Sequence, residues 1–112
     1  MRTSTAIALT ILTLSASTAI AGQVEYGGGV FSPENQVVCD RAGNYCADGT
    51  GISASWTEQY MGAEAARNLA NVDQSEFVFG NGVMCTVATQ SCSQAGKQNK
   101  KTKKLQKMLF GK

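Results

Sequence analysis

The chain has 112 residues, of which 43% are hydrophobic and 16% charged, with a formal net charge of +2, four cysteines and no histidine. The lack of histidine excludes Ser-His-Asp triads and Cys–His nucleophile pairs, and the length allows one domain at most. The small net charge conceals an uneven distribution, because residues 22–96 hold eight acids and two arginines whereas residues 97–112 hold seven lysines and no acid.

The first 21 residues are typical of a secretory signal peptide. Arg2 supplies a positive start, residues 6–14 form an apolar run, and Ala19 and Ala21 place small residues before a cleavage site. A membrane anchor is the alternative, but a bilayer core needs about 20 largely apolar residues, and Thr and Ser interrupt this shorter run. We therefore predict cleavage after Ala21 and a mature protein, residues 22–112, that is periplasmic or secreted.

The four cysteines are expected to form disulfides, because an exported chain folds in an oxidising compartment. Six residues separate Cys39 from Cys46 and Cys85 from Cys92, unlike the shorter gaps of zinc sites, so no metal or cofactor site is expected. A gap of six suits a hairpin with a four-residue loop, which favours the pairs Cys39–Cys46 and Cys85–Cys92. Pairing the two segments with each other would close larger loops and stabilise somewhat more, so energy leaves that alternative open.

The two cysteine segments, residues 31–46 and 79–92, resemble each other. Each has an aromatic residue, a turn-rich stretch and then two cysteines six residues apart. In the first hairpin, Cys39 would face Cys46 across a loop of residues 41–44. The register can place both cysteines at a non-hydrogen-bonded pair, where side chains approach most closely.

The best helix candidate lies between the two cysteine segments. Ser55 and Glu58 fit a capping box, and apolar residues then recur at steps of three or four. A central helix is therefore expected over about residues 55–71. Gly62 interrupts it, so the helix either passes through this glycine or ends there, and a second helix begins at Ala63.

Residues 97–112 are expected to form a lysine-rich tail. Residues 94–99 are polar and predicted to be loose, while Leu105, Met108 and Leu109 share one helical face. The segment fits either a short amphipathic helix or, at its end, a strand returning to the body.

Two interpretations of this tail are open. It is either a solvated segment that can lie against the acidic body, or a site for an anionic membrane or lipopolysaccharide surface, with Leu105, Met108, Leu109 and Phe110 entering the surface. Nucleic acid is not an expected partner, because no aromatic residues alternate with the lysines. The predicted anionic-surface residues are Lys97, Lys100, Lys101, Lys103, Lys104, Lys107 and Lys112.

Four further segments carry a family resemblance. They are residues 46–53 (CADGTGIS), 57–66 (TEQYMGAEAA), 76–85 (EFVFGNGVMC) and the closing residues 102–111. In this order they resemble the Fels-1 prophage protein-like family of the YcgJ type. The resemblance implies a small exported protein of Gram-negative bacteria or their prophages, without an established activity, ligand or catalytic residue. The chain departs from the family pattern after Cys92, so the resemblance assigns no role to the lysines.

These features together predict an α+β fold. A small disulfide-stapled domain, residues 22–96, would have one central helix packed on short antiparallel β-hairpins, followed by the tail, residues 97–112. No catalytic residue is predicted, because the acids near the first hairpin are explained by turns and a helix cap rather than by positioned acid–base partners. The predicted function is that of a non-enzymatic periplasmic interaction module with an unidentified protein partner. The alternative is a small inhibitor of a cationic cell-wall enzyme, which the acidic body suggests.

Overall fold

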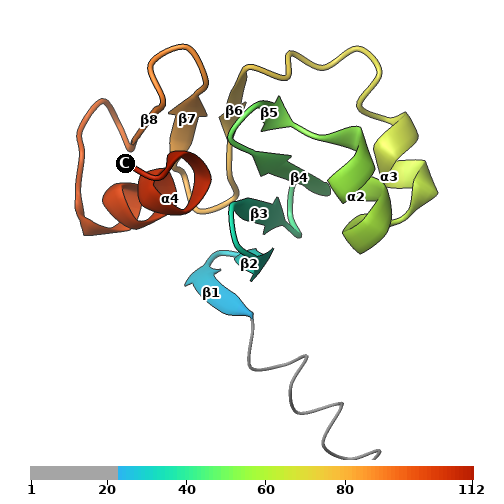
Figure 1. The fold of residues 1–112 in the computed structure, drawn as a ribbon, viewed down its shortest axis with the longest axis horizontal. Helices are drawn as coiled ribbons and strands as arrows, with labels where there is room; N and C mark the ends of the chain where they lie inside the picture. The colour runs from blue at the N-terminus through green and yellow to red at the C-terminus, as the bar shows by residue number, and fades with distance from the viewer. Residues whose placement is uncertain (1–22) are drawn as a thin grey trace, which may run out of the picture.

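The computed structural model describes residues 23–112, so the predicted signal peptide lies outside the described residues. This part of the chain has the predicted α+β fold (Figure 1), and its antiparallel strands form two sheets. It has three helices where one central helix was expected. None of these helices is long and apolar enough to cross a bilayer.

The strands follow the chain in simple meanders. The five-stranded sheet has the order β1-β2-β3-β4-β5, and the three-stranded sheet has the order β6-β7-β8. The strands are β1 (Val24–Gly27), β2 (Val30–Glu34), β3 (Val37–Asp40), β4 (Tyr45–Asp48), β5 (Gly51–Ile52), β6 (Glu76–Val78), β7 (Met84–Thr86) and β8 (Ser91–Ser93). The helices are α2 (Ala54–Met61), α3 (Ala63–Arg67) and α4 (Lys100–Phe110).

Both predicted disulfides are present, each at the centre of a hairpin. Cys39 faces Cys46 and Cys85 faces Cys92, with Cα–Cα separations of 4.0 and 4.1 Å. The short separations are those of non-hydrogen-bonded pairs, and all four cysteines are buried. The local pairing and the predicted register of the first hairpin are therefore confirmed.

In each hairpin, the backbone N–H of the second cysteine donates its hydrogen bond to a helix side chain and not to the facing strand. The Cys46 N–H donates to Oγ1 of Thr57 on α2 at 2.9 Å, and the Cys92 N–H donates to Oε1 of Gln106 on α4 at 3.0 Å. A buried N–H without a partner costs free energy comparable to a lost hydrogen bond. Each helix is thereby tied to the middle of its own disulfide hairpin.

The second sheet and its helix repeat the first. In the first sheet, Phe31, Cys39 and Cys46 lie opposite one another on neighbouring strands. In the second sheet, the residues 46 positions later, Phe77, Cys85 and Cys92, lie opposite one another in the same way. The sequence pattern of the two cysteine segments predicts Phe79 as the counterpart of Phe31. The strand pairing shows that Phe77 is its counterpart, because this residue occupies the position opposite the cysteine.

The helix caps and the tight turns of the two copies are also 46 residues apart. Ser53 caps α2 by accepting the Trp56 N–H at 3.1 Å, and Asn99 caps α4 by accepting the Thr102 N–H at 2.9 Å. Each hairpin loop also ends in a left-handed residue, with a φ of 61° at Asn44 in the first and 51° at Gln90 in the second. The chain from β2 to α2 and the chain from β6 to α4 are therefore two copies of one motif.

The predicted central helix is divided in two. Of the two alternatives for residues 55–71, the structure has two helices: α2 ends before Gly62, and α3 ends at Arg67. The φ of Gly62 is 103°, a value at which a residue with a side chain would be strained. The cap is Ser53 rather than Ser55, because Ser53 still has an extended backbone whereas Ser55 is already helical.

The lysine-rich segment is the helix α4 and belongs to the core. Leu105 and Leu109 are almost completely buried and join the larger apolar cluster with residues of both sheets. The expectation of a separate tail is therefore replaced by a helix that covers the second sheet and contacts β3 and β4 of the first. Gln94, expected in a loose stretch, forms an isolated bridge with Lys97.

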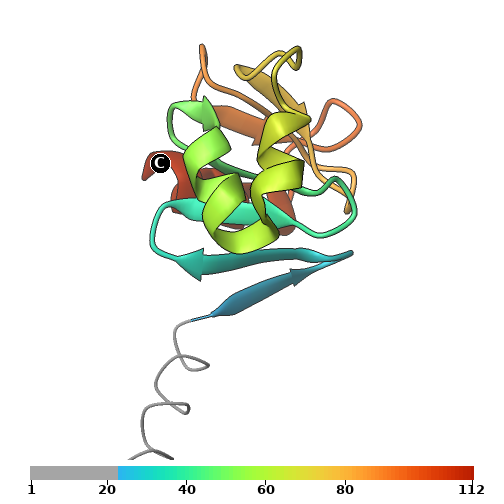
Figure 2. The ribbon, with the colours of Figure 1, turned by 90° about the vertical axis from the view of Figure 1, so that its right-hand side faces the viewer.

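The first sheet lies between α2 and α3 in front of it and α4 behind it (Figure 2), and apolar residues pack on both of its faces. On one side, Phe31 and Val37 pack with the first disulfide against Trp56 and Tyr60 of α2. On the other side, the larger cluster joins the first sheet to the second sheet and to α4. Burial on both faces explains why β3 has no exposed residue.

A buried carboxylate fixes the two copies to each other. Asp40, only 1% exposed, accepts hydrogen bonds from the N–H groups of Ala42 at 3.1 Å and Gly80 at 2.8 Å. The second bond crosses from the first hairpin to the turn between β6 and β7. A side chain at Gly80 would be crowded there, since an added Cβ would lie 3.0 Å from Asp40 Oδ1 and from the Gly28 carbonyl oxygen.

The position of α4 in the core can be tested by a single truncation. Leu105→Ala should lower the free energy of unfolding by about 2–5 kcal/mol, because it leaves a cavity in a packed interior. Lys103→Ala, on the exposed side of the same helix, should change it by less than about 0.5 kcal/mol. Chemical denaturation of both variants measures the difference, and equal stabilities would show that α4 is a solvated tail.

Candidate functional site

The helix α4 separates its lysines from its apolar residues. Its buried side chains are Thr102, Leu105 and Leu109. Steps of three and four residues place Lys100, Lys103, Lys104 and Lys107 together on the exposed side, and we call these four residues the lysine face. Lys97, Lys101 and Lys112, the other predicted anionic-surface residues, are exposed around it.

The two leucines of α4 are not available to an external surface. Leu105 and Leu109 are inside the core, whereas Met108 and Phe110 are half-buried against it. The expectation that the apolar residues of α4 enter an anionic surface is therefore wrong for both leucines, because the second sheet is too small to close its own core without them.

The acidic body does not neutralise the lysines. Within residues 23–112, Arg41 and Glu25 form the one ion pair, at 3.3 Å, and no lysine takes part in it. The first turn of α4 has no acid, while Lys100 and Lys101 stand at the positive end of the helix dipole. Neighbouring lysines three and four residues apart also repel one another. An anion bound at this face would relieve both unfavourable interactions.

The remaining charges emphasise this asymmetry. Four exposed acids lie on α2, on α3 and before or at the start of β6: Glu58, Glu64, Asp73 and Glu76. Figure 1 shows α2 and α3 on the opposite side of the sheets from α4. The molecule therefore has a basic side on α4 and an acidic side on α2 and α3.

A groove lies between the lysine face and the edge of the first sheet. It has a volume of about 560 Å³ and is bounded by β1, the turn between β2 and β3, and α4. We call it the β1–α4 groove; its lining residues are Val24, Tyr26, Asn35, Gln36, Lys104, Lys107, Met108 and Gly111. A smaller hollow of about 290 Å³ shares Tyr26 and Lys104 with it and adds Lys100, Lys101 and Glu25.

The groove has an apolar floor, and one of its walls is fixed. Tyr26 is half-buried against the core, and this burial raises the pKa of its hydroxyl. The Gln36 N–H donates to Sδ of Met108 at 3.4 Å and holds the turn against α4. Val24 is 44% exposed at the mouth. Apolar surface is thus left open beside ammonium groups.

Sequence reasoning missed the contribution of β1 to this groove. The chain bends sharply at Gly27–Gly29, and all three glycines have a positive φ. It folds β1 back on β2 as a hairpin. The alternation of Val24 and Tyr26 immediately before the glycines was the available signal for a strand.

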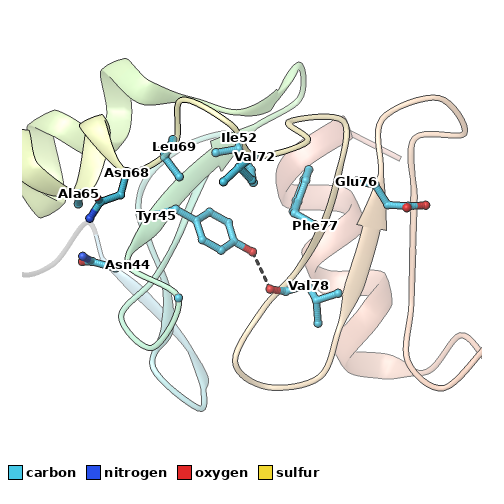
Figure 3. A pocket seen from close by; sticks show the side chains of 11 residues that line it. Asn44, Tyr45, Ile52, Ala65, Asn68, Leu69, Val72, Glu76, Phe77 and Val78 are labelled. Carbon is cyan, nitrogen blue, oxygen red and sulfur yellow. Dashed lines mark hydrogen bonds between the residues drawn. The ribbon is translucent and has the colours of Figure 1, made fainter.

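A second cavity lies between the first hairpin, α3 and β6 (Figure 3). Its volume is about 370 Å³, and its walls include Tyr45, Ile52, Leu69 and Phe77. The Tyr45 hydroxyl donates to the Val78 carbonyl oxygen at 2.8 Å. Burial, and then the negative charge of Asp40, raise the pKa of Tyr45. The cavity offers apolar surface but no charged side chain inside it, since the Glu76 carboxylate points away from it in Figure 3.

The acids considered for catalysis are occupied or isolated. Asp40 is buried and holds two N–H groups, and Asp48 accepts the backbone N–H of Thr50 at 2.9 Å within a turn. Glu58 is exposed on α2 and is not part of the predicted capping box. Across residues 23–112, no group of three or more Cys, Asp or Glu side chains is arranged to hold a metal ion.

Comparisons with known proteins agree with the resemblance at the level of the family. A family model described as "YcgJ protein" matches residues 30–110, from the start of β2 to the end of α4. "Uncharacterized protein YcgJ" of Escherichia coli (strain K12) is 40% identical over 96 residues, which cover 74% of this chain and 75% of that protein. No solved structure matches the chain.

The buried hydroxyl of Tyr45 predicts a loss of stability at high pH. Because the pKa of Tyr45 is raised in the folded state, its contribution is complete below the ordinary tyrosine pKa of about 10 and is lost as pH rises above that value. Tyr45→Phe should lower the free energy of unfolding by about 1 kcal/mol at pH 7, because the hydrogen bond to Val78 is lost. Above pH 9, the free energy of unfolding of this variant should fall less steeply with pH than that of the unmodified protein. Denaturation from pH 7 to 11 measures both effects, and equal pH slopes would contradict the assignment.

Proposed function

This chain belongs to the YcgJ family, and we propose that it is an exported, non-enzymatic protein that attaches to anionic envelope surfaces through the lysine face of α4. The observation that carries the proposal is the placement of four exposed lysines on one side of a rigid helix, with no acid of the described chain paired to them. Suitable surfaces are anionic phospholipid or the phosphate groups of lipopolysaccharide.

The energetics favour attachment by charge. A lysine near an anionic lipid surface contributes about 1 kcal/mol, so a face of four lysines supplies several kcal/mol at low ionic strength. The attraction is screened over about 10 Å at 0.1 M salt. Since Leu105 and Leu109 are buried, insertion of α4 does not contribute, and the affinity should fall steeply with salt.

The charge asymmetry also sets an orientation. With α4 facing an anionic surface, the acidic residues on α2 and α3 face away from it. The surface then repels the acidic side while it attracts the basic side. The acidic side remains free for a partner of opposite charge.

Export is part of the proposal. It is supported by the signal-like residues 1–21 and by two disulfides, which are compatible with an oxidising compartment. The proposal includes no nucleic-acid partner.

A second candidate function is inhibition of a cationic cell-wall enzyme. The acidic side favours it, because complementary charge speeds and orients association. Under this function Glu58 and Glu64, on α2 and α3, would make the contact. Their replacement by glutamine should then weaken inhibition and leave vesicle binding unchanged.

The lysine face can be tested with two variants of equal net charge. Lys100→Gln/Lys103→Gln removes two lysines from the face, whereas Lys97→Gln/Lys112→Gln removes two outside the helix. With about 1 kcal/mol per lysine, the first variant should bind phosphatidylglycerol vesicles about 30-fold more weakly. The second variant should lose less than about threefold, because its lysines lie beside the face.

Sedimentation of residues 22–112 with vesicles at low and moderate salt measures these affinities, with phosphatidylcholine vesicles as the uncharged control. Equal losses in the two variants, or binding that salt does not weaken, would refute attachment through the lysine face.

A further inference from the structure

We infer that the β1–α4 groove binds one molecule of a single-chain lipid with a phosphate head, the chain lying on Val24, Tyr26 and Met108 and the head on Lys104 and Lys107. The inference rests on the proposed function, for which it names a specific ligand. The lysine face would then act both as a surface for attachment and as the rim of a binding site.

The size and composition of the groove favour a ligand with an apolar part. Its volume of about 560 Å³ lies within the range of small-molecule sites. Val24 is 44% exposed, and Tyr26 and Met108 are half-buried beside it. Folding leaves this apolar surface of the groove in water. A hydrocarbon chain bound along it would remove the surface of the groove and the surface of the chain from water.

The charges at the rim select the head group. Lys104 and Lys107 line the groove itself, and Lys100 and Lys101 line the adjoining hollow. The only carboxylate in either lining is Glu25, which is engaged by both terminal nitrogens of Arg41 at 3.3 Å. Several lysines along one rim suit a phosphate, whose oxygens accept more charge-assisted hydrogen bonds than a carboxylate offers.

The walls combine a rigid side with an adaptable one. On the rigid side, α4 is anchored by Leu105 and Leu109, and the turn between β2 and β3 is held to Met108 by the Gln36 N–H. On the other side, β1 is an edge strand that pairs only with β2 and has an irregular register near Tyr26. The helix that carries the lysines is thus held in place, while the strand can adjust to a chain.

The second cavity, against Tyr45 and Leu69, is less suited to this ligand. It is smaller, at about 370 Å³, and is lined by no lysine or arginine. It therefore serves as an internal comparison, because a purely apolar ligand would have no reason to prefer the β1–α4 groove.

The experiment is a calorimetric titration of residues 22–112 with dodecyl phosphate below its micelle-forming concentration. Dodecyl maltoside tests the need for charge, inorganic phosphate tests the need for a chain, and dodecanoate tests the choice of head group. Dodecyl phosphate should bind at least about tenfold more tightly than any of these three, because each lacks or weakens one of the two contacts. Far-UV circular dichroism of each mixture verifies that the protein stays folded.

Matched variants locate the site. Val24→Asn should weaken dodecyl phosphate binding by about fivefold, whereas Val72→Asn, at a position that is 42% exposed and outside the groove, should leave it within about twofold. Lys104→Gln/Lys107→Gln should weaken it by about tenfold or more, and Lys97→Gln/Lys112→Gln by less than about threefold. Equal effects of Val24→Asn and Val72→Asn, or equal binding of the maltoside, would overturn the inference.

The outcomes distinguish this inference from the proposed function. Val24→Asn should bind phosphatidylglycerol vesicles as the unmodified protein does, since the lysine face is intact. Vesicle binding that depends on the lysines, without dodecyl phosphate binding, removes the groove ligand alone. Dodecyl phosphate binding at the groove without vesicle binding removes surface attachment and leaves the protein a carrier of a single lipid.

Discussion

The buried cross-strand disulfide at the centre of each hairpin is the constraint on which the rest of this fold depends. A three-stranded meander with strands of three to five residues is too small to bury a sufficient core alone. In each copy the disulfide joins the second and third strands, and the N–H of the second cysteine bonds to a helix side chain, Thr57 or Gln106. The cross-link therefore positions the helix as well as the hairpin, and through Gln106 it positions the lysine face.

Two copies of one motif have acquired opposite charge. The helices α2 and α4 occupy equivalent places, 46 residues apart, and begin at equivalent caps, Ser53 and Asn99. The exposed side of α2 carries Glu58, whereas that of α4 carries lysines. Because the copies lie on different sides of the shared core (Figure 1), this divergence separates the charge of the whole molecule. The repeated motif would thus orient the molecule in the proposed attachment, with its acidic side facing away from the surface.

Local sequence patterns were sufficient where a feature depended on neighbouring residues. The loop length between Cys39 and Cys46 predicted the register and the disulfide, and Gly62 marked one of two possible helix boundaries. Patterns failed where a feature depended on distant contacts. The spacing of Leu105 and Leu109 predicted a helical face but not the sheets that cover it, so lysine content suggested a tail. The β1–α4 groove joins segments from opposite ends of the described chain, and no local pattern relates them.

The central claim is that the disulfides hold both copies in place. The most direct test is to purify the protein from the compartment in which it folds, count its free thiols, and measure its thermal unfolding before and after reduction. Each disulfide closes a loop that contributes about 2.5 kcal/mol in the chain-entropy account, so loss of both should lower the midpoint by about 20 °C or more. The account predicts no free thiol before reduction and this large decrease after it. Four free thiols in the untreated protein, with a midpoint that reductant does not change, would contradict it.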